Sequence, residues 1–410
     1  MNRQTIDITL SATANAQRMN ENFEELYGVQ GGTSSKKLKI LVVANSHGFD
    51  CWSYVPFILK EYGVDIELGL FYKAGQGIDG HYTNYSTGEA YADGANNPRL
   101  MYIDTATDTA WQVAFQSISG GENASVQRAV KYAEWDIIVL MAAHSQAGMS
   151  SAYTMTDELY NKIAADMDKP FLLGMMTSII YQGWWQNAML ANVRNACNVF
   201  PIDIVFPCGT AIYNAQQDET LDAINTHLFS SDTVHLNEGM PCYIAALANV
   251  EKIFRTFYPH LSIINDQTRS TAAWLSGKNV PGQQGTVDDT AVTEDNCYLA
   301  QRMALLANNY PFDIANRKVT ISYNLGGGRI HGTITDNGGN DQSRINSGTF
   351  KKMRHCNLCI HVQPASGETT LDSVSYTYQG VTRNCTIADN AALIVIDDLV
   401  DDVTITASAS

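Results

Sequence analysis

Ser46, Asp232 and His235 have the residue types and the order that nucleophilic catalysis by serine requires. A histidine can remove the hydroxyl proton of a serine, and a carboxylate can hold the imidazole in the tautomer that accepts it. The segment Asp232-Thr233-Val234-His235 offers both partners. The sequence therefore predicts Ser46 as a nucleophile, His235 as its general base and Asp232 as the group that orients the base.

The serine follows the apolar, β-branched run Ile40–Ala44, which ends abruptly at a small polar cluster. Such a run is typical of a buried parallel strand. In open α/β sheets ligands bind at the carboxyl ends of the strands, so we expect Ser46 at that edge. A serine after a strand is more often a helix N-cap; its combination with Asp232 and His235 favours catalysis.

Residues 37–312 alternate between strand-like and helical segments. This order predicts βαβ units and an α/β fold with a doubly wound parallel sheet. We interpret residues 84–121, whose patterns are weak, as an insertion near the active-site edge, where specificity often lies. The strand candidates are Lys39–Val43, Asp65–Tyr72, Asp136–Leu140, Pro170–Met175 and Ile202–Phe206. The helix candidates are Asn123–Ala133, Tyr153–Met167, Trp185–Val199 and Pro241–Tyr258.

Short blocks of the chain follow the order of one hydrolase superfamily. The blocks are Ala44–Gly48, Trp52–Leu59, Ala74–His81, Cys208–Ala215 and Asp232–Leu236. On these blocks the chain resembles the SGNH (GDSL-like) hydrolases, in particular a branch common in gut Bacteroidetes and their phages. The resemblance covers about residues 37–260 and extends at most to 312. Each block alone is a weak signal, and their shared order makes it specific.

The resemblance implies a three-layer SGNH-like fold and a mechanism without metal or organic cofactor. It assigns Ser46, His235 and Asp232 the roles given above. It also implies that the backbone N–H groups of Ser46 and Gly75 face the oxyanion. Asn45, beside the nucleophile, is expected to brace the turn and not to take part in the chemistry.

One departure concerns the third oxyanion donor, an Asn or Gln side chain that the superfamily supplies after a middle strand. The near relatives have two glutamines there, whereas this chain has Met141 and Ala142. Loss of one donor typically costs ~10²–10³ in rate. Three alternatives stay open: His144 or Gln146 replaces the donor, the enzyme is slow, or the chain has lost catalysis.

Other residues near the blocks are candidates for substrate contacts. His47, His81 and His144 lie in or beside matched blocks, although a surface or hydrogen-bonded histidine is the commoner case. Trp184 and Trp185 follow Gly183 and could stack on a sugar ring, with buried packing as the equal alternative.

Composition limits the classes of partner. The chain has 410 residues, 45% of them hydrophobic and 17% charged, and a formal net charge of −16. These values predict a globular protein and argue against nucleic acid or an anionic membrane as partner. We find no secretory signal and no apolar run of membrane-spanning length, so we expect either a virion protein or a soluble protein without a signal peptide.

The eight cysteines do not form a disulfide framework. The Cys356-x-x-Cys359 motif, flanked by His355 and His361, offers soft metal ligands. A structural zinc site normally has a second ligand pair elsewhere in the chain, and this region alternates like a strand. We therefore expect no metal site here.

The two ends of the chain differ from its middle. Residues 1–36 combine a strand-like run, an amphipathic helix over Asn15–Tyr27 and a Gly/Ser-rich linker. This leader resembles N-terminal segments of phage tail and fibre proteins, and a helix capping the catalytic domain is the alternative. We expect it to mediate attachment or oligomerisation, with a trimer as one option. Residues 313–410 show short strands separated by turns, which predicts a β-sandwich.

Together these observations favour a serine esterase that removes an acyl group from a bacterial surface glycan, and acetyl is the acyl group that we expect. If the leader is of phage type, the protein is a tail or virion component, with other virion proteins as partners. The alternative is a virion protein that keeps the fold and binds glycan without hydrolysing it. Met141 and Ala142 favour this second hypothesis, whereas the intact Ser46, Asp232 and His235 favour the first.

Overall fold

The computed structural model describes most of the chain from residue 37 onward. The leader at 1–36 and Asp232 lie outside the described residues. The chain divides into two compact units, one of residues 1–213 and 227–313 and one of residues 214–226 and 314–410, and each is described by itself. The described residues are 37–87, 97–118, 123–181, 183–217, 228–229, 234–263, 274, 276–281, 292–293, 296–313, 318–325, 330–335, 341–345, 347–353, 358–365, 369–396 and 399–410.

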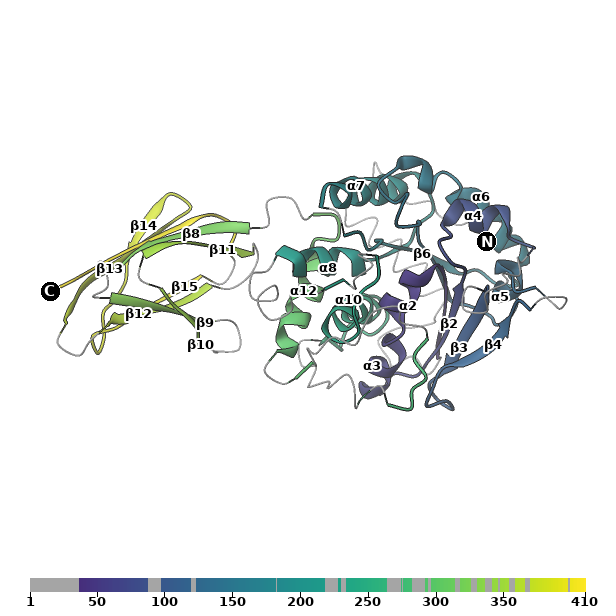
Figure 1. The fold of residues 1–410 in the computed structure, drawn as a ribbon, viewed down its shortest axis with the longest axis horizontal. Helices are drawn as coiled ribbons and strands as arrows, with labels where there is room; N and C mark the ends of the chain where they lie inside the picture. The colour runs from purple at the N-terminus through teal and green to yellow at the C-terminus, as the bar shows by residue number, and fades with distance from the viewer. Residues whose placement is uncertain are drawn as a thin grey trace. The chain divides into compact units, whose positions relative to one another are not determined.

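A mixed, mainly parallel sheet forms the centre of the first unit (Figure 1). Its strands are β1 (Leu38–Ala44), β2 (Ile66–Tyr72), β3 (Arg99–Asp104), β4 (Gln112–Gln116), β5 (Ile137–Leu140), β6 (Leu172–Met176) and β7 (Ile204–Phe206). They lie in the order β4-β3-β2-β1-β5-β6-β7, and β2, β1, β5, β6 and β7 are parallel. The parallel strands thus follow the order 2-1-3-4-5, in which the chain changes direction between β1 and its neighbour β5.

The parallel strands are apolar because both of their faces are covered. All residues of β2 and β5 are buried, as are all but one of β1. The five strand segments predicted from sequence are confirmed, each within two residues at either end.

Helices cover both faces of this sheet. The helical elements are α2 (Ser46–Trp52), α3 (Val55–Glu61), α4 (Ile78–Thr83), α5 (Val126–Val130), η2 (Ser150–Tyr153), α6 (Thr156–Asp166), α7 (Gly183–Val199), α8 (Cys208–Gln217), α10 (Met240–Phe257) and α12 (Cys297–Asn309). Trp52 of α2 packs on Phe206, which lies on the sheet face of Val139. Trp135, just after α5, lies on the face of Leu41 and Gly69. Because neighbouring positions along a strand face opposite ways, α2 and α5 lie on opposite faces.

The segment interpreted as an insertion needs correction. Its residues 99–116 include β3 and β4, which extend the sheet beyond β2 with antiparallel pairing. In β3 the adjacent residues Leu100 and Met101 are both buried, so it does not alternate strictly, and β4 buries only Phe115 on an otherwise exposed edge. Hydrophobic periodicity was therefore too weak to reveal them. In register, Arg99 lies opposite Tyr72, at the carboxyl end of β2.

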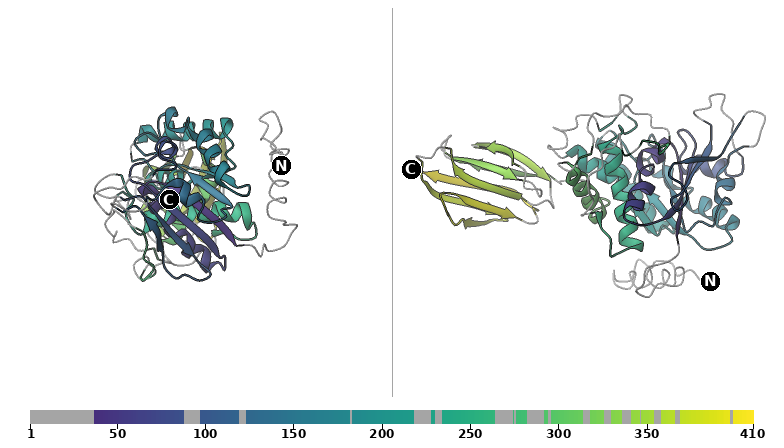
Figure 2. Two further views of the ribbon diagram at one scale, coloured as in Figure 1. Left: turned by 90° about the vertical axis from the view of Figure 1, so that its right-hand side faces the viewer. Right: turned by 90° about the horizontal axis from the view of Figure 1, so that it is seen from below.

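The second unit is β-rich, as predicted, and contains two sheets (Figure 2). Their orders are β10-β9-β12-β15 and β11-β8-β16-β13-β14. The strands are β8 (Lys318–Asn324), β9 (Ile330–Thr335), β10 (Asp341–Ile345), β11 (Ser347–Met353), β12 (Leu358–Pro364), β13 (Leu371–Tyr378), β14 (Val381–Asn384), β15 (Ala392–Ile396) and β16 (Val403–Ala409). Buried side chains of both sheets, among them Ile321, Ile360, Ile394 and Ile405, form one core. The last strand, β16, pairs parallel with the first, β8.

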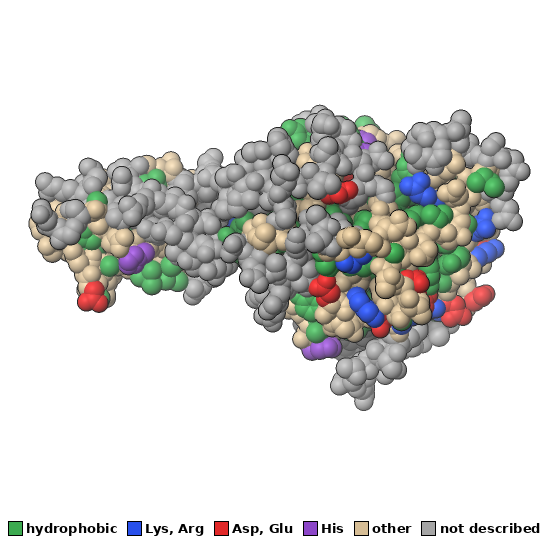
Figure 3. All heavy atoms as spheres, turned by 60° about the horizontal axis from the view of Figure 1, so that its bottom comes forward, with side chains coloured by type: hydrophobic (Ala, Val, Ile, Leu, Met, Phe, Trp, Pro, Cys, Tyr) green, Lys and Arg blue, Asp and Glu red, His purple; other side chains and the backbone are tan. Residues whose placement is uncertain are grey.

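Two of the possible metal ligands in the sequence, Cys359 and His361, lie on the outer face of β12, which pairs with β15. Cys359 and His361 alternate with buried Leu358 and Ile360, which confirms the strand-like alternation. They pair across with Val395 and Leu393, both about half exposed. Figure 3 shows hydrophobic side chains gathered beside a histidine on this unit. Within the described part of the chain, no group of three or more His, Cys, Asp or Glu residues could hold a metal ion.

Among the helices of the described residues, none is both long and apolar enough to cross a bilayer.

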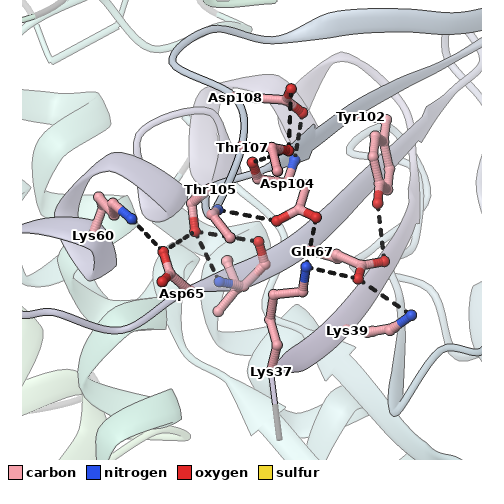
Figure 4. A network of polar contacts seen from close by, with 12 residues as sticks. Lys37, Lys39, Lys60, Asp65, Glu67, Tyr102, Asp104, Thr105, Thr107 and Asp108 are labelled. Atoms are coloured by element: carbon pink, nitrogen blue, oxygen red, sulfur yellow. Dashed lines mark hydrogen bonds and ion pairs between the residues drawn. The ribbon is translucent and has the colours of Figure 1, made fainter.

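A polar network occupies the amino-terminal ends of β1 and β2, opposite the edge that carries Ser46 (Figure 4). Glu67 accepts a hydrogen bond from the Tyr102 hydroxyl at 2.9 Å and lies 3.1 and 3.2 Å from the ammonium groups of Lys37 and Lys39. Burial lowers the pKa of Lys37, but hydrogen bonds to Asp104 and Glu67 outweigh it, and the pKa is raised. Glu67 itself is buried.

We expect Glu67→Gln to lower the free energy of unfolding by about 1–3 kcal/mol, because two lysines lose a buried charged acceptor. Urea unfolding followed by circular dichroism measures the loss. The kinetic constants should stay unchanged, since the network lies at the opposite edge of the sheet. An unchanged unfolding midpoint would show that the network contributes nothing net.

Candidate active site

The structure brings Ser46 and His235 together although 189 residues separate them in the chain, with Ser46 Oγ 2.7 Å from His235 Nε2. This distance is within hydrogen-bond reach for a nucleophile and its base. Both residues are partly exposed, so a substrate can reach them. Asp232 lies outside the described residues, and its orienting role stays a prediction.

Ser46 is positioned by the short turn from β1 into α2. Ser46 is the first residue of α2, and only Asn45 separates it from β1. The Asn45 side chain accepts a hydrogen bond from the His47 N–H at 3.0 Å and donates one to the Gln76 carbonyl at 2.9 Å. The first bond caps the helix, and the second ties the turn to the loop after β2. The prediction that Asn45 braces the turn is confirmed.

The turn also requires a glycine at position 48. A Cβ on Gly48 would lie 2.7 Å from the Cβ of Ala44, closer than carbon atoms approach. The helix can therefore start directly over the strand end, and the serine side chain stands at the edge of the sheet.

Gly75 lies in the loop after β2, in a turn closed by a bond of 3.2 Å from the Gln76 N–H to the Lys73 carbonyl. Its φ of +63° is typical of the third position of a type II turn, which favours glycine. Gly75 is exposed, and its N–H does not close the turn. The first N–H groups of a helix, including that of Ser46, have no acceptor within the helix. Both groups can therefore serve as donors to an oxyanion.

Three loops meet at this edge of the sheet. A Cβ on Gly77 would lie 2.6 Å from the backbone nitrogen of Ala143, so the loop after β2 packs directly on the loop after β5. The Asn45–Gln76 bond joins the loop after β1 to the same place. Ser46 thus lies where the sheet order changes direction, which is where ligands bind in this class of sheet.

Three histidine rings follow one another beside Ser46. The ring of His47 lies 5.7 Å from that of His235 and 5.3 Å from that of His144, between centroids. Met141 and Ala142 are fully buried, and the Ala142 carbonyl accepts a bond from the Ser178 hydroxyl at 3.0 Å. These two residues therefore serve packing. Gln146 is exposed, and of the two replacement donors His144 is the one within the histidine cluster.

Asp50 is a residue that the sequence interpretation missed. It lies one helical turn after Ser46 in α2, is buried, and accepts a hydrogen bond from the Leu236 N–H at 3.3 Å. The same short helix thus carries Ser46 and binds the backbone next to His235. The spacing of four residues between Ser46 and Asp50 was the available signal, because such residues share a helix face.

The segment that carries His235 has further supports. Leu236 forms an isolated bridge with Phe229, and the Asn237 side chain donates to the Phe229 carbonyl at 3.2 Å. The Gly239 N–H, just before α10, donates to the Tyr54 hydroxyl at 3.4 Å. These contacts fix the segment that directly follows His235.

His81 does not line the site, contrary to its prediction as a substrate contact. It is buried and packs against the ring of Phe71, at 6.0 Å between centroids. Burial, with a smaller contribution from the charge of Lys73, lowers the pKa of His81 to about 3. The imidazole is therefore neutral at physiological pH, and its role is packing beneath the loops.

Of the two tryptophans predicted as a stacking platform, the structure describes the side chain of one. The side chain of Trp184 lies outside the described residues, whereas the partly buried Trp185 ring covers Gly148, whose Cβ would lie 1.9 Å from it. Tyr181, which was not predicted, is 53% exposed and packs edge-on against Phe229 at 5.3 Å between centroids. Because Phe229 bridges Leu236, Tyr181 is the exposed aromatic ring tied to the His235 segment.

We expect Asp50→Ala to lower kcat by about 10²-fold with little change in KM, because a shift of ~1 Å in a catalytic group costs that much. Asp50→Asn keeps an acceptor oxygen for the Leu236 N–H and should lose less. Steady-state kinetics on a short-chain ester measures both variants. Glu67→Gln is the matched control, since it also removes a buried carboxylate but far from Ser46. Equal kcat values in Asp50→Ala and wild type would contradict the positioning role.

Comparisons with known proteins find similarity to one protein family, and the description of that family names no activity. Residues 180–279 match the family model described as a domain of unknown function, DUF4886. No curated protein matches. Among solved structures, the chain is similar to a crystal structure of a DUF4886 family protein from Bacteroides uniformis, with 19% identity and a TM-score of 0.49 over 68% of this chain and 98% of that one. The family model covers less than half of the chain, so the similarity concerns this part of the sequence.

Proposed function

We propose that this protein is a serine esterase that removes acyl groups from a bacterial surface polysaccharide, with acetyl as the expected acyl group. The observation that carries the proposal is the 2.7 Å approach of Ser46 Oγ to His235 Nε2 at the carboxyl edge of a mainly parallel sheet. The strand order and the helices on both faces support the finer proposal, a three-layer SGNH-like hydrolase fold.

The first half of the reaction forms an acyl-enzyme. His235 Nε2 takes the proton of Ser46 as Oγ attacks the ester carbonyl carbon, and the carbonyl oxygen becomes an oxyanion. The N–H groups of Ser46 and Gly75 stabilise this charge. The bond to the sugar oxygen then breaks, and His235 gives its proton to the leaving sugar alkoxide.

The second half hydrolyses the acyl-enzyme and regenerates the free enzyme. His235 removes a proton from water, the resulting hydroxide attacks the acyl carbon, and the bond to Ser46 Oγ breaks as Oγ regains the proton. The products are the free acid and the deacylated sugar. Asp232 is expected to stabilise the imidazolium in both halves, and Asp50 to hold the backbone beside the base.

The exposed ring of Tyr181 supports a carbohydrate substrate, because aromatic faces pack on sugar rings. The β-rich second unit is proposed to bind glycan or to serve assembly. The phage-like leader at 1–36 is the ground for proposing a tail or virion location, with homo-oligomerisation and contacts to other virion proteins. We propose no metal, no cofactor, no nucleic acid and no membrane as partner.

A second candidate function is glycan binding without hydrolysis. Its specific support is the burial of Met141 and Ala142, which leaves no side-chain donor at the position where near relatives have glutamines. Activity of the purified protein separates the two candidates.

The deciding experiment combines hydrolysis of p-nitrophenyl acetate with labelling by a fluorophosphonate probe. We expect wild type to turn over the ester and to be labelled, and Ser46→Ala to lose labelling and ~10⁴–10⁶ in kcat. Asp232→Asn should be milder than His235→Ala, because it perturbs the tautomer but leaves the base. Absence of both activity and labelling in wild type would favour the binding protein, and turnover by Ser46→Ala at the wild-type rate would refute the nucleophile.

The third oxyanion donor is tested by His144→Ala and Gln146→Ala. If His144 donates in the transition state, its alanine variant should lose ~10²-fold in kcat with little change in KM. Gln146→Ala is the matched control and should behave like wild type, because its side chain is exposed. Similar kinetics for both variants and wild type would leave the backbone N–H groups as the only donors.

A further inference from the structure

His47 contacts the rings of two other histidines at the edge of the sheet that carries Ser46. Its ring meets that of His235 almost at a right angle, with an interplanar angle of 82° and 5.7 Å between centroids. The ring of His144 lies 5.3 Å from that of His47, at an angle of 54°. Both distances are within the ~4.5–7 Å of attractive aromatic pairs. His47 is 1% exposed, so a buried ring links two partly exposed ones.

The position of His47 is set by the same turn that positions Ser46. The two residues are adjacent in α2, and the His47 N–H donates to the Asn45 side chain at 3.0 Å. Gly48, the next residue, lies directly over Ala44 of β1. The ring of His235 therefore packs against the helix turn that also carries Ser46.

The loop that carries His144 supports His47 independently of the His235 segment. A bond of 3.0 Å from the Gln146 N–H to the Ala143 carbonyl closes a turn around His144. The backbone of Ala143 packs directly on Gly77, in the loop after β2. His47 is thus packed against a loop that is itself held at the sheet edge.

His235 needs such a contact because the ring of a histidine turns easily about its Cβ–Cγ bond. The preferences of that torsion are broad, unlike those of torsions between saturated carbons. In the structure Nε2 lies 2.7 Å from Ser46 Oγ. Half a turn of the ring replaces Nε2 at this place by the carbon Cε1, which accepts no proton. The backbone contacts at Leu236 and Gly239 fix the segment but not the rotation of the ring.

We propose that His47 is a positioning residue for the general base: its ring packs against that of His235 and keeps Nε2 directed at Ser46 Oγ. This inference rests on the proposed esterase function. His47 takes no part in the proton transfers, and its contribution comes from the ring and not from the ring nitrogens. It complements Asp232, whose proposed hydrogen bond holds the imidazole by its other nitrogen.

Three variants separate the ring of His47 from its nitrogens. His47→Phe keeps a flat ring without nitrogen, His47→Gln keeps a polar side chain of similar size without a ring, and His47→Ala keeps neither. On p-nitrophenyl acetate we expect the glutamine and alanine variants to lose about 10²-fold in kcat, because a shift of ~1 Å in a catalytic group costs that much. KM should change little, the sign of an interaction that matters in the transition state.

The phenylalanine variant should restore most of the wild-type kcat, because it restores the ring contact. Glu67→Gln is the control for a loss of stability, since it acts at the opposite edge of the sheet and should keep the wild-type kcat. Thermal unfolding of each variant, followed by circular dichroism, separates lost stability from lost activity.

Two kinetic results would overturn the proposal. Wild-type kcat in both His47→Ala and His47→Gln would show that the ring contact does not position His235. A loss in His47→Phe as large as that in His47→Ala, at an unchanged melting temperature, would assign the effect to the nitrogens of His47.

A spectroscopic measurement keeps this inference separate from the esterase proposal and does not need the phenylalanine variant. In protein labelled with ¹⁵N-histidine, the ring nitrogens report the tautomer of His235, whose signals are identified by their loss in His235→Ala. At mildly alkaline pH we expect one tautomer in wild type, with Nε2 as the acceptor, and a mixture of both in His47→Gln.

The two proposals then fail separately. A mixture of tautomers in His47→Gln, in a protein whose wild type has no esterase activity, would uphold the positioning role and refute the hydrolase. Activity of wild type on the ester, together with the same single tautomer in wild type and His47→Gln, would do the reverse.

Discussion

The turn between β1 and α2 is the constraint on which the candidate site depends. The helix begins one residue after the strand ends, and Gly48 lies so close to Ala44 that no larger residue fits. In this short space the Asn45 side chain both caps the helix and joins the neighbouring loop at Gln76. The position of Ser46 is therefore set by backbone geometry, while its hydrogen-bond partner His235 comes from a distant part of the chain.

Helix α2 carries a second contact to this distant segment. Ser46 meets His235, and Asp50, one turn later, holds the backbone of Leu236. Two contacts from one helix restrict the position and the direction of the segment that carries His235. Such preorganisation matters because catalytic groups must be held close to their productive geometry. In the sheet order, Arg99 of β3 and Tyr181, which follows β6, lie on opposite sides of β1. Arg99 contacts the Tyr72 ring, and Tyr181 contacts the Phe229 ring.

Those parts of this arrangement that leave a hydrophobic pattern or a motif spacing in the sequence could be predicted from it. The parallel strands were found because their burial on both faces leaves long apolar runs. The antiparallel β3 and β4 were not, because β3 does not alternate regularly and the edge strand β4 buries a single residue. The pairing of Ser46 with His235 was predicted, yet His81 was misassigned, since a motif does not say whether its histidine points to solvent or to the core. Asp50 was missed because its partner is a backbone N–H, which no residue type reveals. The orienting role of Asp232 and the third oxyanion donor stay predictions.

The parallel pairing of β16 with β8 bears on the order in which the protein is made. The strands are separated by most of the second unit in sequence, and β16 lies inside its sheet, between β8 and β13. During synthesis β8 can pair early with β11, but its other edge waits unpaired until residues 403–409 emerge. The first unit needs no such late strand for its sheet, whose seven strands end with Phe206. Because domains generally fold as units as the chain emerges, the sheet that carries Ser46 can assemble while the second unit is still incomplete.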